Sequence, residues 1–175
     1  MAGDRHSAQD VLQSKLDAVF TVLKEKDLEK QAKFKAIEDI VTPMFDFPLM
    51  AKLSLGKKHW SVLTEENRDH FSTLFVKRLR QSYLDKLLAY SDEKIIYGSA
   101  VDVDNKIHIP SDLVSKDKKI SMLYKFYASK SGWRVYDIEI QGVSIVRSYR
   151  SQFAEILKKG SFNDLIQKLE KPIEN

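Results

Sequence analysis

A change of periodicity at Gly142 constrains the fold more than any other feature of the sequence. Before it, apolar and charged residues alternate between Val135 and Ile140, as they do in a strand with two unlike faces. After it, apolar residues recur every three or four positions as far as Leu157, which is the spacing of a helix. Glycine in a strand-like run marks a bend or a close approach of the backbone. The sequence therefore predicts a tight corner at Gly142 that joins a sheet to a helix, with Trp133 and Tyr136 filling a core just before it.

Period-two patterns in the middle of the chain predict an antiparallel sheet. The four expected strands cover residues 94–103, 106–115, 120–129 and 133–140. Short turns join them, and consecutive strands joined by short turns form an antiparallel meander. We expect Ile95, Tyr97, Val101 and Val103 to share one face of the first strand. Pro110 predicts an edge position or a bulge for the second strand, because proline lacks the N–H that a ladder needs.

Helical spacing surrounds this sheet on both sides in the sequence. Helices are expected over residues 7–23, 28–41, 49–56, 64–90 and 144–159, with a last short helix after Ser161. Ser7, Thr64 and Ser144 are the expected caps, and Pro43 ends the second helix. The predicted class is α+β, with a single domain over 1–175: helices in 7–90, the sheet in 94–140, and C-terminal helices in 144–170.

Composition favours a globular chain with a sizeable core. Of 175 residues, 43% are hydrophobic and 31% charged, and there is no cysteine to form a disulfide or a thiolate site. The apolar runs are far shorter than the ~20 residues that span a bilayer. Net charge is +4, but lysine and arginine alternate with acids, so no nucleic-acid partner is predicted. We interpret the basic residues as an ordinary solvated surface. The alternative interpretation is a weak attraction to anionic lipid surfaces.

Groups that could perform catalysis do not converge in the sequence. No histidines have metal-ligand spacing, no glycine-rich loop could hold a phosphate, and we expect no metal or cofactor. Asp137 and Glu139 share a strand face and could be paired carboxylates. A polar face, or a salt bridge to Arg147 or Arg150, is the reading we favour. No enzymatic activity is therefore predicted.

A family resemblance lies in the same stretch as the corner. The matching positions are Trp133, Val135, Tyr136, Asp137, Gly142, Val143, Ser144, Val146, Tyr149, Arg150, Gln152 and Phe153. Their pattern is similar to the C-terminal signature of the MlaC family, also called the toluene-tolerance family. Leu55, Gly56 and Trp60 resemble a second family segment with one extra residue in the spacing. Gln141 and Ser148 depart from the residues common in the family, but neither removes an apolar group.

The resemblance implies a soluble periplasmic carrier that helps to maintain outer-membrane lipid asymmetry in a Gram-negative bacterium. An NTF2-like cone would enclose an apolar cavity for the acyl tails of one phospholipid, the cargo. The implied partners are an outer-membrane lipoprotein–porin complex and an inner-membrane ABC transporter with MCE-domain proteins, met by a monomer. Since MAGDRHSAQD has no signal-peptide pattern, Met1 would begin a mature form of an exported chain.

Residues expected to line the cavity are apolar positions of the predicted helices and strands. They are Met50, Leu55, Trp60, Phe71, Phe75, Leu79, Tyr83, Val101, Val103, Met122, Tyr124, Phe126, Tyr136, Ile138, Val143 and Val146. We expect the 71/75/79 face of the long helix to look at the 122/124/126 face of the third strand across the cavity. Without the resemblance, periodic aromatic residues indicate an ordinary core. A small enzyme or an apolar-ligand sensor on a similar fold is the alternative function.

Overall fold

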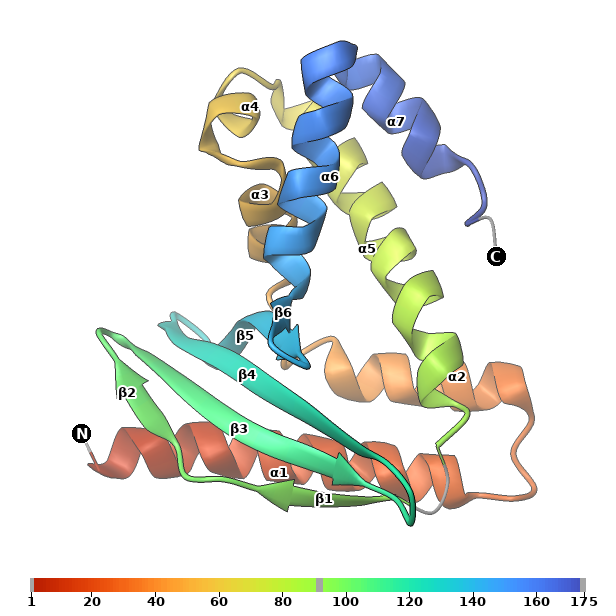
Figure 1. Cartoon of the computed structure of the whole chain (residues 1–175), viewed down its shortest axis with the longest axis vertical. Coiled ribbons are helices and arrows are strands. Elements are labelled where there is room, and N and C mark those ends of the chain that lie inside the picture. The colour runs from red at the N-terminus through yellow and green to blue at the C-terminus, as the bar shows by residue number, and fades with distance from the viewer. Residues whose placement is uncertain (1, 91–92, 174–175) are drawn as a thin grey trace. The chain divides into compact units, whose positions relative to one another are not determined.

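The structure is a computed structural model that describes residues 2–90 and 93–173, apart from the side chains of residues 2, 3, 84 and 85. Its elements follow the chain from N to C terminus (Figure 1). They are α1 (Ala2–Lys24), α2 (Lys30–Val41), α3 (Phe47–Leu55), α4 (Lys57–Ser61), α5 (Glu65–Leu87), β1 (Lys94–Tyr97), β2 (Val101–Val103), β3 (Lys106–Val114), β4 (Lys119–Ser129), β5 (Gly132–Ile140), β6 (Val143–Ser144), α6 (Ile145–Lys159) and α7 (Phe162–Glu170). Within these residues, no helix is long and apolar enough to span a membrane.

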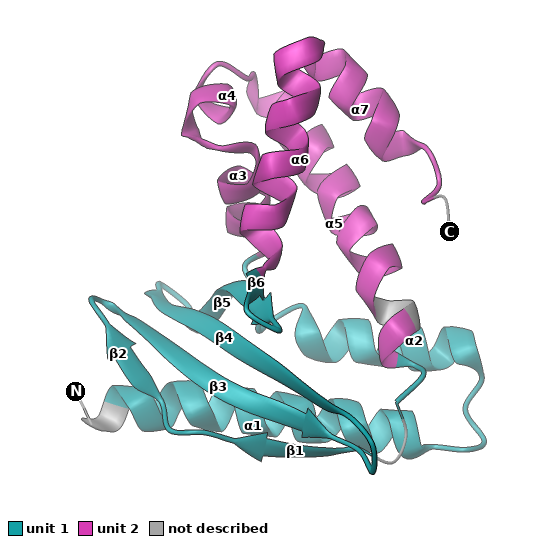
Figure 2. Ribbon diagram, viewed as in Figure 1, with its two compact units in different colours: residues 1–46, 88–143 teal, residues 47–87, 144–175 magenta. Residues whose placement is uncertain are grey.

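Two compact units make up the chain, each from two separate stretches of sequence (Figure 2). Unit 1 contains Met1–Asp46 and Leu88–Val143, which hold α1, α2 and most of the sheet. Unit 2 contains Phe47–Leu87 and Ser144–Asn175, which hold the five helices α3, α4, α5, α6 and α7. The expectation of a single domain stays a prediction.

The sheet of unit 1 is antiparallel, with the order β1-β3-β4-β5-β6, and β2 also pairs with β3. The meander is confirmed, but the prediction of four strands is wrong. The first expected strand is split into β1 and β2, and a short β6 follows the corner. Each addition or break occurs where the chain turns at or near a glycine, Gly98 or Gly142.

The break between β1 and β2 lies opposite Pro110 on β3. The Gly98 N–H donates to the Pro110 carbonyl over 2.8 Å, and a Cβ on Gly98 would come within 2.7 Å of the proline ring. In an antiparallel strand, the N–H and the C=O of one residue point toward the same neighbouring strand. The Pro110 carbonyl points toward the break between β1 and β2, so the missing N–H of Pro110 leaves no donor unpaired there. Pro110 therefore sits in an inner strand, and the prediction of an edge position is wrong.

One face of the sheet is covered by α1. Ile107, Ile109 and Phe126 on this face are almost completely buried. Asp102 pairs in register with Ile107 and accepts hydrogen bonds from Arg5 of α1, which places α1 on this side. We call it the helix-covered face. Apolar residues at Ala8, Leu12, Leu16, Val19 and Leu23 of α1 complete the core of unit 1.

A bulge in β5 decides which side chains reach that core. The pairing with β4 shifts between Lys125 and Phe126, so that Val135 and Ile138, not Tyr136, lie on the helix-covered face. Such a bulge inserts one extra residue and reverses the alternation beyond it. The prediction that Tyr136 fills this core is therefore wrong. Trp133 pairs with Ala128 on the helix-covered face, where it is half-buried.

Helix ends follow the sequence more closely. The Thr64 and Ser144 hydroxyls accept hydrogen bonds from the Asn67 and Arg147 N–H groups, over 3.2 and 3.0 Å, which confirms both caps. Ser161 and Asp164 form a capping box at the start of α7. Ser7 is not a cap, because α1 already includes Ala2.

Candidate functional site: an apolar group in each unit and a polar sheet face

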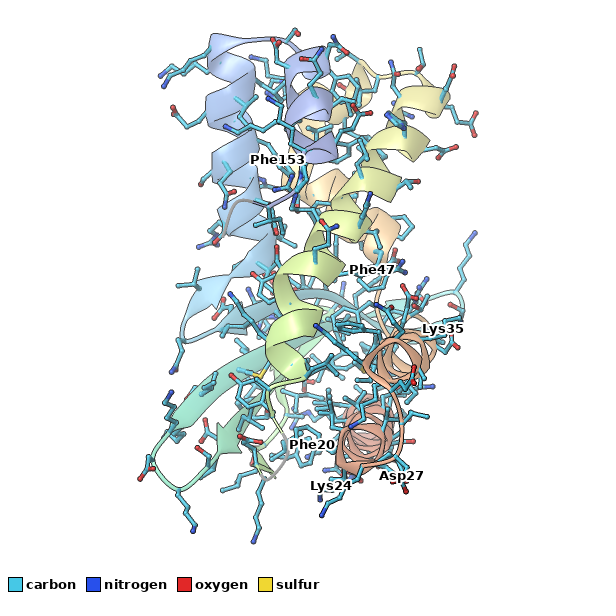
Figure 3. The ribbon with its side chains drawn as sticks, turned by 90° about the vertical axis from the view of Figure 1, so that its right-hand side faces the viewer. Phe20, Lys24, Asp27, Lys35, Phe47 and Phe153 are labelled. Carbon is cyan, nitrogen blue, oxygen red and sulfur yellow. The ribbon has the colours of Figure 1, made fainter. Side chains whose placement is uncertain are left out.

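An aromatic cluster fills the centre of unit 2. Phe71 and Phe75 of α5 have no exposed surface. The Phe71 ring meets the Phe153 ring edge-on at 5.6 Å between centroids, and the Phe75 ring meets Tyr149 of α6 in the same way at 5.4 Å. Figure 3 marks Phe153 among the helices of this unit. The two phenylalanines are therefore packed against α6.

The other expected lining residues of unit 2 differ in how much surface they leave. Met50, Leu55, Leu79 and Val146 are buried. Trp60 and Tyr83 are half-buried. The Arg68 guanidinium lies 5.5 Å from the Trp60 ring centroid and donates to its carbonyl over 3.1 Å, so it fixes α4 against α5. Burial, and then the nearby Tyr149, raise the pKa of Tyr83.

In unit 1, four of the expected residues of β4 and β5 gather on the helix-covered face. Tyr124, Phe126 and Ile138 are buried, and Met122 is half-buried. The Tyr124 hydroxyl points to the Met122 sulfur at 3.7 Å. Burial is the main reason that the pKa of Tyr124 is raised. These four residues form one continuous apolar group on two paired strands.

Tyr97 brings a second phenol to the helix-covered face. Its hydroxyl is buried without a hydrogen-bond partner among the described residues. Burial, and then the charge of Asp17, raise the pKa of Tyr97 to about 12. Residues 97–100 also line a cleft of about 460 Å³ together with Arg5, His6 and Gln9. With those polar side chains, the cleft is unlike the apolar cavity that the family resemblance implies.

Four expected lining residues of unit 1 lie away from that group. Val101 and Val103 are 53% and 38% exposed, and their register with His108 and Lys106 puts them on the other face of the sheet. The prediction that they share a face with Ile95 and Tyr97 is wrong, because the break in the strand resets the alternation. Val143 is 59% exposed and Tyr136 lies across the sheet from the helix-covered face.

Opposite the helix-covered face, a polar face carries a buried ion cluster. The Lys125 ammonium lies 3.1 Å from Asp137 and 2.7 Å from Glu139. Only 13% of the lysine side chain and 6% of the aspartate side chain are exposed. Burial works against the charge of Lys125, but the hydrogen bonds to both carboxylates outweigh it and raise its pKa.

The cluster corrects the expected salt bridge to Arg147 or Arg150, since the cation comes from β4. The available signal was the alternation of Lys125 with Tyr124 and Phe126, which puts it on the face opposite theirs. Because each carboxylate already has a cation, this pair lacks the free base that general acid–base chemistry needs.

Histidine and tyrosine extend the polar face. The His108 Nε2 lies 3.2 Å from the Tyr136 hydroxyl. Burial, and then the positive charge of Lys125, lower the pKa of His108. At the far edge, Tyr127 donates to Asp46, and Arg134 donates to the Phe45 carbonyl over 2.6 Å. Within the described residues, no three histidines or acids are grouped so that they could hold a metal ion.

Comparison with known proteins adds to this geometry. The profile of the MlaC protein family matches residues 13–171. This chain belongs to the MlaC family. The resemblance seen in the sequence is thereby confirmed.

Two curated relatives align with most of the chain. The intermembrane phospholipid transport system binding protein MlaC of Haemophilus influenzae is 30% identical over 122 residues, which is 66% of this chain and 56% of that protein. Toluene tolerance protein ttg2D of Pseudomonas putida is 25% identical over 136 residues, 77% of this chain and 63% of that protein. The aligned part thus covers less than two thirds of either relative.

A solved structure resembles the fold over almost its whole length. It is the phospholipid-binding protein from Ralstonia solanacearum in complex with a phospholipid. The TM-score is 0.85 at 25% identity, and the match covers 94% of this chain and 95% of that one.

Proposed function

We propose that this MlaC family protein is a phospholipid carrier without enzymatic activity of its own. The observation that supports it most is the structural match to a phospholipid-binding protein that was solved with its lipid. The names of the two curated relatives, a phospholipid transport protein and a toluene tolerance protein, point the same way.

The apolar groups of the chain suit such a cargo. Two acyl chains hold roughly 30 methylenes, each worth about 0.8 kcal/mol on leaving water. A free phospholipid therefore almost never crosses an aqueous space alone, whereas exchange between a bilayer and an apolar protein cavity costs little net free energy. In this proposal an NTF2-like cavity takes the acyl tails and leaves the head group near solvent.

The carrier works in the periplasm, between an outer-membrane lipoprotein–porin complex and an inner-membrane ABC transporter with MCE-domain proteins. Because uptake and delivery are exchanges of nearly equal free energy, direction comes from these partners. Their joint effect is the maintenance of outer-membrane lipid asymmetry. The carrier itself then needs neither ATP nor a cofactor.

The proposed lining is narrowed by burial. A lipid tail can only contact side chains that still have free surface, so we do not expect the fully buried Phe71 and Phe75 to touch it. Trp60, Tyr83, Met122 and Tyr136 are the half-buried candidates, and of these Trp60 is already covered by Arg68 and Tyr136 lies on the polar face. We therefore propose Tyr83 and Met122 as side chains that touch a tail.

Native mass spectrometry of the purified protein tests the proposal. We expect a phospholipid to co-purify in a one-to-one complex. Tyr83→Glu and Met122→Glu, each in its own unit, should lower the lipid-bound fraction at least about tenfold, because an unpaired charge against acyl chains is costly. Gln81→Glu, an exposed change on the same helix as Tyr83, should leave the fraction within about twofold.

The variant Phe75→Glu is expected to unfold unit 2, because its ring is fully buried against Tyr149 and Phe153. Circular dichroism separates that outcome from loss of cargo. A wild-type protein that neither co-purifies with phospholipid nor takes it up from vesicles would refute the proposed function. Folded glutamate variants with full lipid occupancy would refute the lining alone.

A further inference from the structure

Cations gather in the part of unit 2 formed by α3, the second half of α5 and the first half of α6. The charged residues of these three segments are Lys52, Lys77, Arg78, Arg80, Lys86, Arg147 and Arg150, with Asp85 as their single acid. The net charge of +4 over the whole chain is thus distributed unevenly. The sequence alone, in which acids and bases alternate, does not reveal this grouping.

Contacts along α3 bring several of these cations together. Arg150 of α6 donates from Nε to the Leu53 carbonyl over 2.9 Å, near the end of α3. The Arg80 guanidinium of α5 lies 5.9 Å from the ring centroid of Phe47, at the start of α3. Lys52 on α3 is exposed. Figure 3 marks Phe47, which locates this start of α3.

Arg147 completes the group, since it precedes Arg150 by three residues and lies on the same side of α6. It is also exposed. We call Lys52, Arg80, Arg147 and Arg150 the basic strip.

Three described carboxylates of unit 2 are engaged elsewhere, and Glu65, Glu66 and Asp69 lie in the first half of α5, outside the segments that carry the cations. Glu155 pairs with Lys159 at 3.7 Å, and Asp164 belongs to the capping box of α7. Glu170 lies 3.5 Å from the His70 ring. Among the described ion pairs, none involves Lys52 or Arg147. At Lys52 and Arg147, the basic strip therefore carries positive charge that no described carboxylate of unit 2 neutralises.

Apolar residues are interleaved with the strip on α3. Pro48 is exposed, and Leu49 and Leu53 are half-buried. Basic residues around apolar side chains on a helix surface are typical of a protein that lies on a membrane, where the cations meet lipid phosphates and the apolar atoms meet the acyl boundary.

We propose that the basic strip docks the protein on the surface of an anionic phospholipid bilayer. The choice of a bilayer over an acidic protein rests on the proposed function, because a phospholipid carrier takes up and releases its cargo at membranes. Each cation that approaches an anionic leaflet raises the binding constant about fivefold. The attraction is screened by salt, since the Debye length falls from about 10 Å at 0.1 M to about 3 Å at 1 M.

Co-sedimentation with vesicles tests the strip. The probes are vesicles of phosphatidylglycerol mixed with phosphatidylcholine, and vesicles of phosphatidylcholine alone. We expect binding to the anionic vesicles at about 0.05 M salt, loss of it at about 0.5 M salt, and little binding to the neutral ones. Lys52→Glu with Arg147→Glu should weaken the binding at least about tenfold. Neither residue is engaged in a described side-chain contact, so the fold should survive, as circular dichroism would show.

The matched control is Lys57→Glu with Lys58→Glu, two exposed lysines of α4 in the same unit. It changes the net charge of the protein by the same amount and should retain binding within about twofold. Equal losses in both double variants would overturn the strip in favour of unspecific net charge. If the wild-type protein does not bind anionic vesicles, the proposal that the strip docks on a bilayer is refuted, and an acidic protein surface becomes the expected partner.

Cargo occupancy separates this inference from the proposed function. The strip variant should keep its co-purified lipid, because none of its changes touches a proposed lining residue. A protein that binds vesicles but never carries phospholipid would leave the docking surface standing and refute the carrier. A protein that carries phospholipid but ignores anionic vesicles would refute the docking surface alone.

Discussion

Gly142 shows how one residue can be required for a reason other than the expected one. Its φ is +78°, and Gln141 before it has φ +51°. Two successive positive φ angles are typical of a two-residue hairpin turn, here between β5 and β6. A Cβ at Gly142 would meet nothing within 4 Å. A close approach of the backbone, one of the two expectations for Gly142, is found at Gly98 instead.

Substitution of Gly142 should therefore cost only the left-handed backbone conformation. Gly142→Val is expected to lower the free energy of unfolding by about 1–3 kcal/mol, because a β-branched side chain is strained at this φ. Gly142→Asn should cost less, since asparagine tolerates the same region. Urea unfolding of both variants measures the difference. An asparagine variant as unstable as the valine one would show that space, not φ, limits this position.

His108 should make stability depend on pH. Burial, Lys125 and Lys106 lower its pKa in the folded protein, while Glu139 and Asp137 oppose them. The unfolded chain keeps a pKa near the ordinary value of about 6.5, so it takes up the proton first as the pH falls. The contribution of His108 is thus present above about pH 6.5 and is lost below it.

In His108→Gln, the melting temperature should fall less than in the wild type between about pH 7.5 and about pH 5.5. Calorimetry at several pH values gives the slope of melting temperature against pH for the wild type and for the variant. Parallel slopes would mean that the histidine is protonated equally well in the folded and the unfolded protein.

At the scale of elements, the end of α7 depends on a side chain far away in sequence. Arg78 of α5 donates to the carbonyls of Lys168, Leu169 and Lys171, over 2.9, 3.3 and 2.9 Å. The last carbonyls of a helix have no partner within it, so the guanidinium supplies what the helix cannot. This contact joins α5 to α7 inside unit 2.

Arg78→Met should therefore destabilise unit 2 by about 2 kcal/mol, with the loss concentrated at the end of α7. Hydrogen exchange of the α7 amides, together with urea unfolding, measures it. The neighbouring exposed change Lys77→Met serves as the control and should stay within about 0.5 kcal/mol. Equal protection of α7 in both variants would contradict the capping role of Arg78.

At the scale of the whole molecule, each unit combines stretches that are distant in the sequence. In unit 1 the sheet packs against α1, which precedes it by several elements and in turn contacts α2. In unit 2, α5 packs with α6 and α7 from the other end of the chain. The strand-to-helix corner at residues 142–145 is one of the places where the chain passes from one unit to the other.

Local chemistry determined what the sequence could predict. The type and approximate bounds of the main helices, the caps at Thr64 and Ser144, and the antiparallel meander all depend on neighbours within a few residues. The family followed from side-chain types at fixed spacing in Trp133–Phe153. For the candidate lining, the sequence identified which residues are apolar, but it did not determine how much of each side chain is exposed in the folded protein.

Tertiary structure alone decided the rest. The gap opposite Pro110 and the bulge at Lys125 and Phe126 turned Val101, Val103 and Tyr136 to the face opposite Tyr124, and no local pattern encodes such a shift of register. The partners of Arg78 and Asp137 likewise lie on other elements, because a buried charge is stabilised by whichever opposite group the packed fold brings within reach. Periodicity gives each strand two faces, and only the pairing of strands determines which of them is buried.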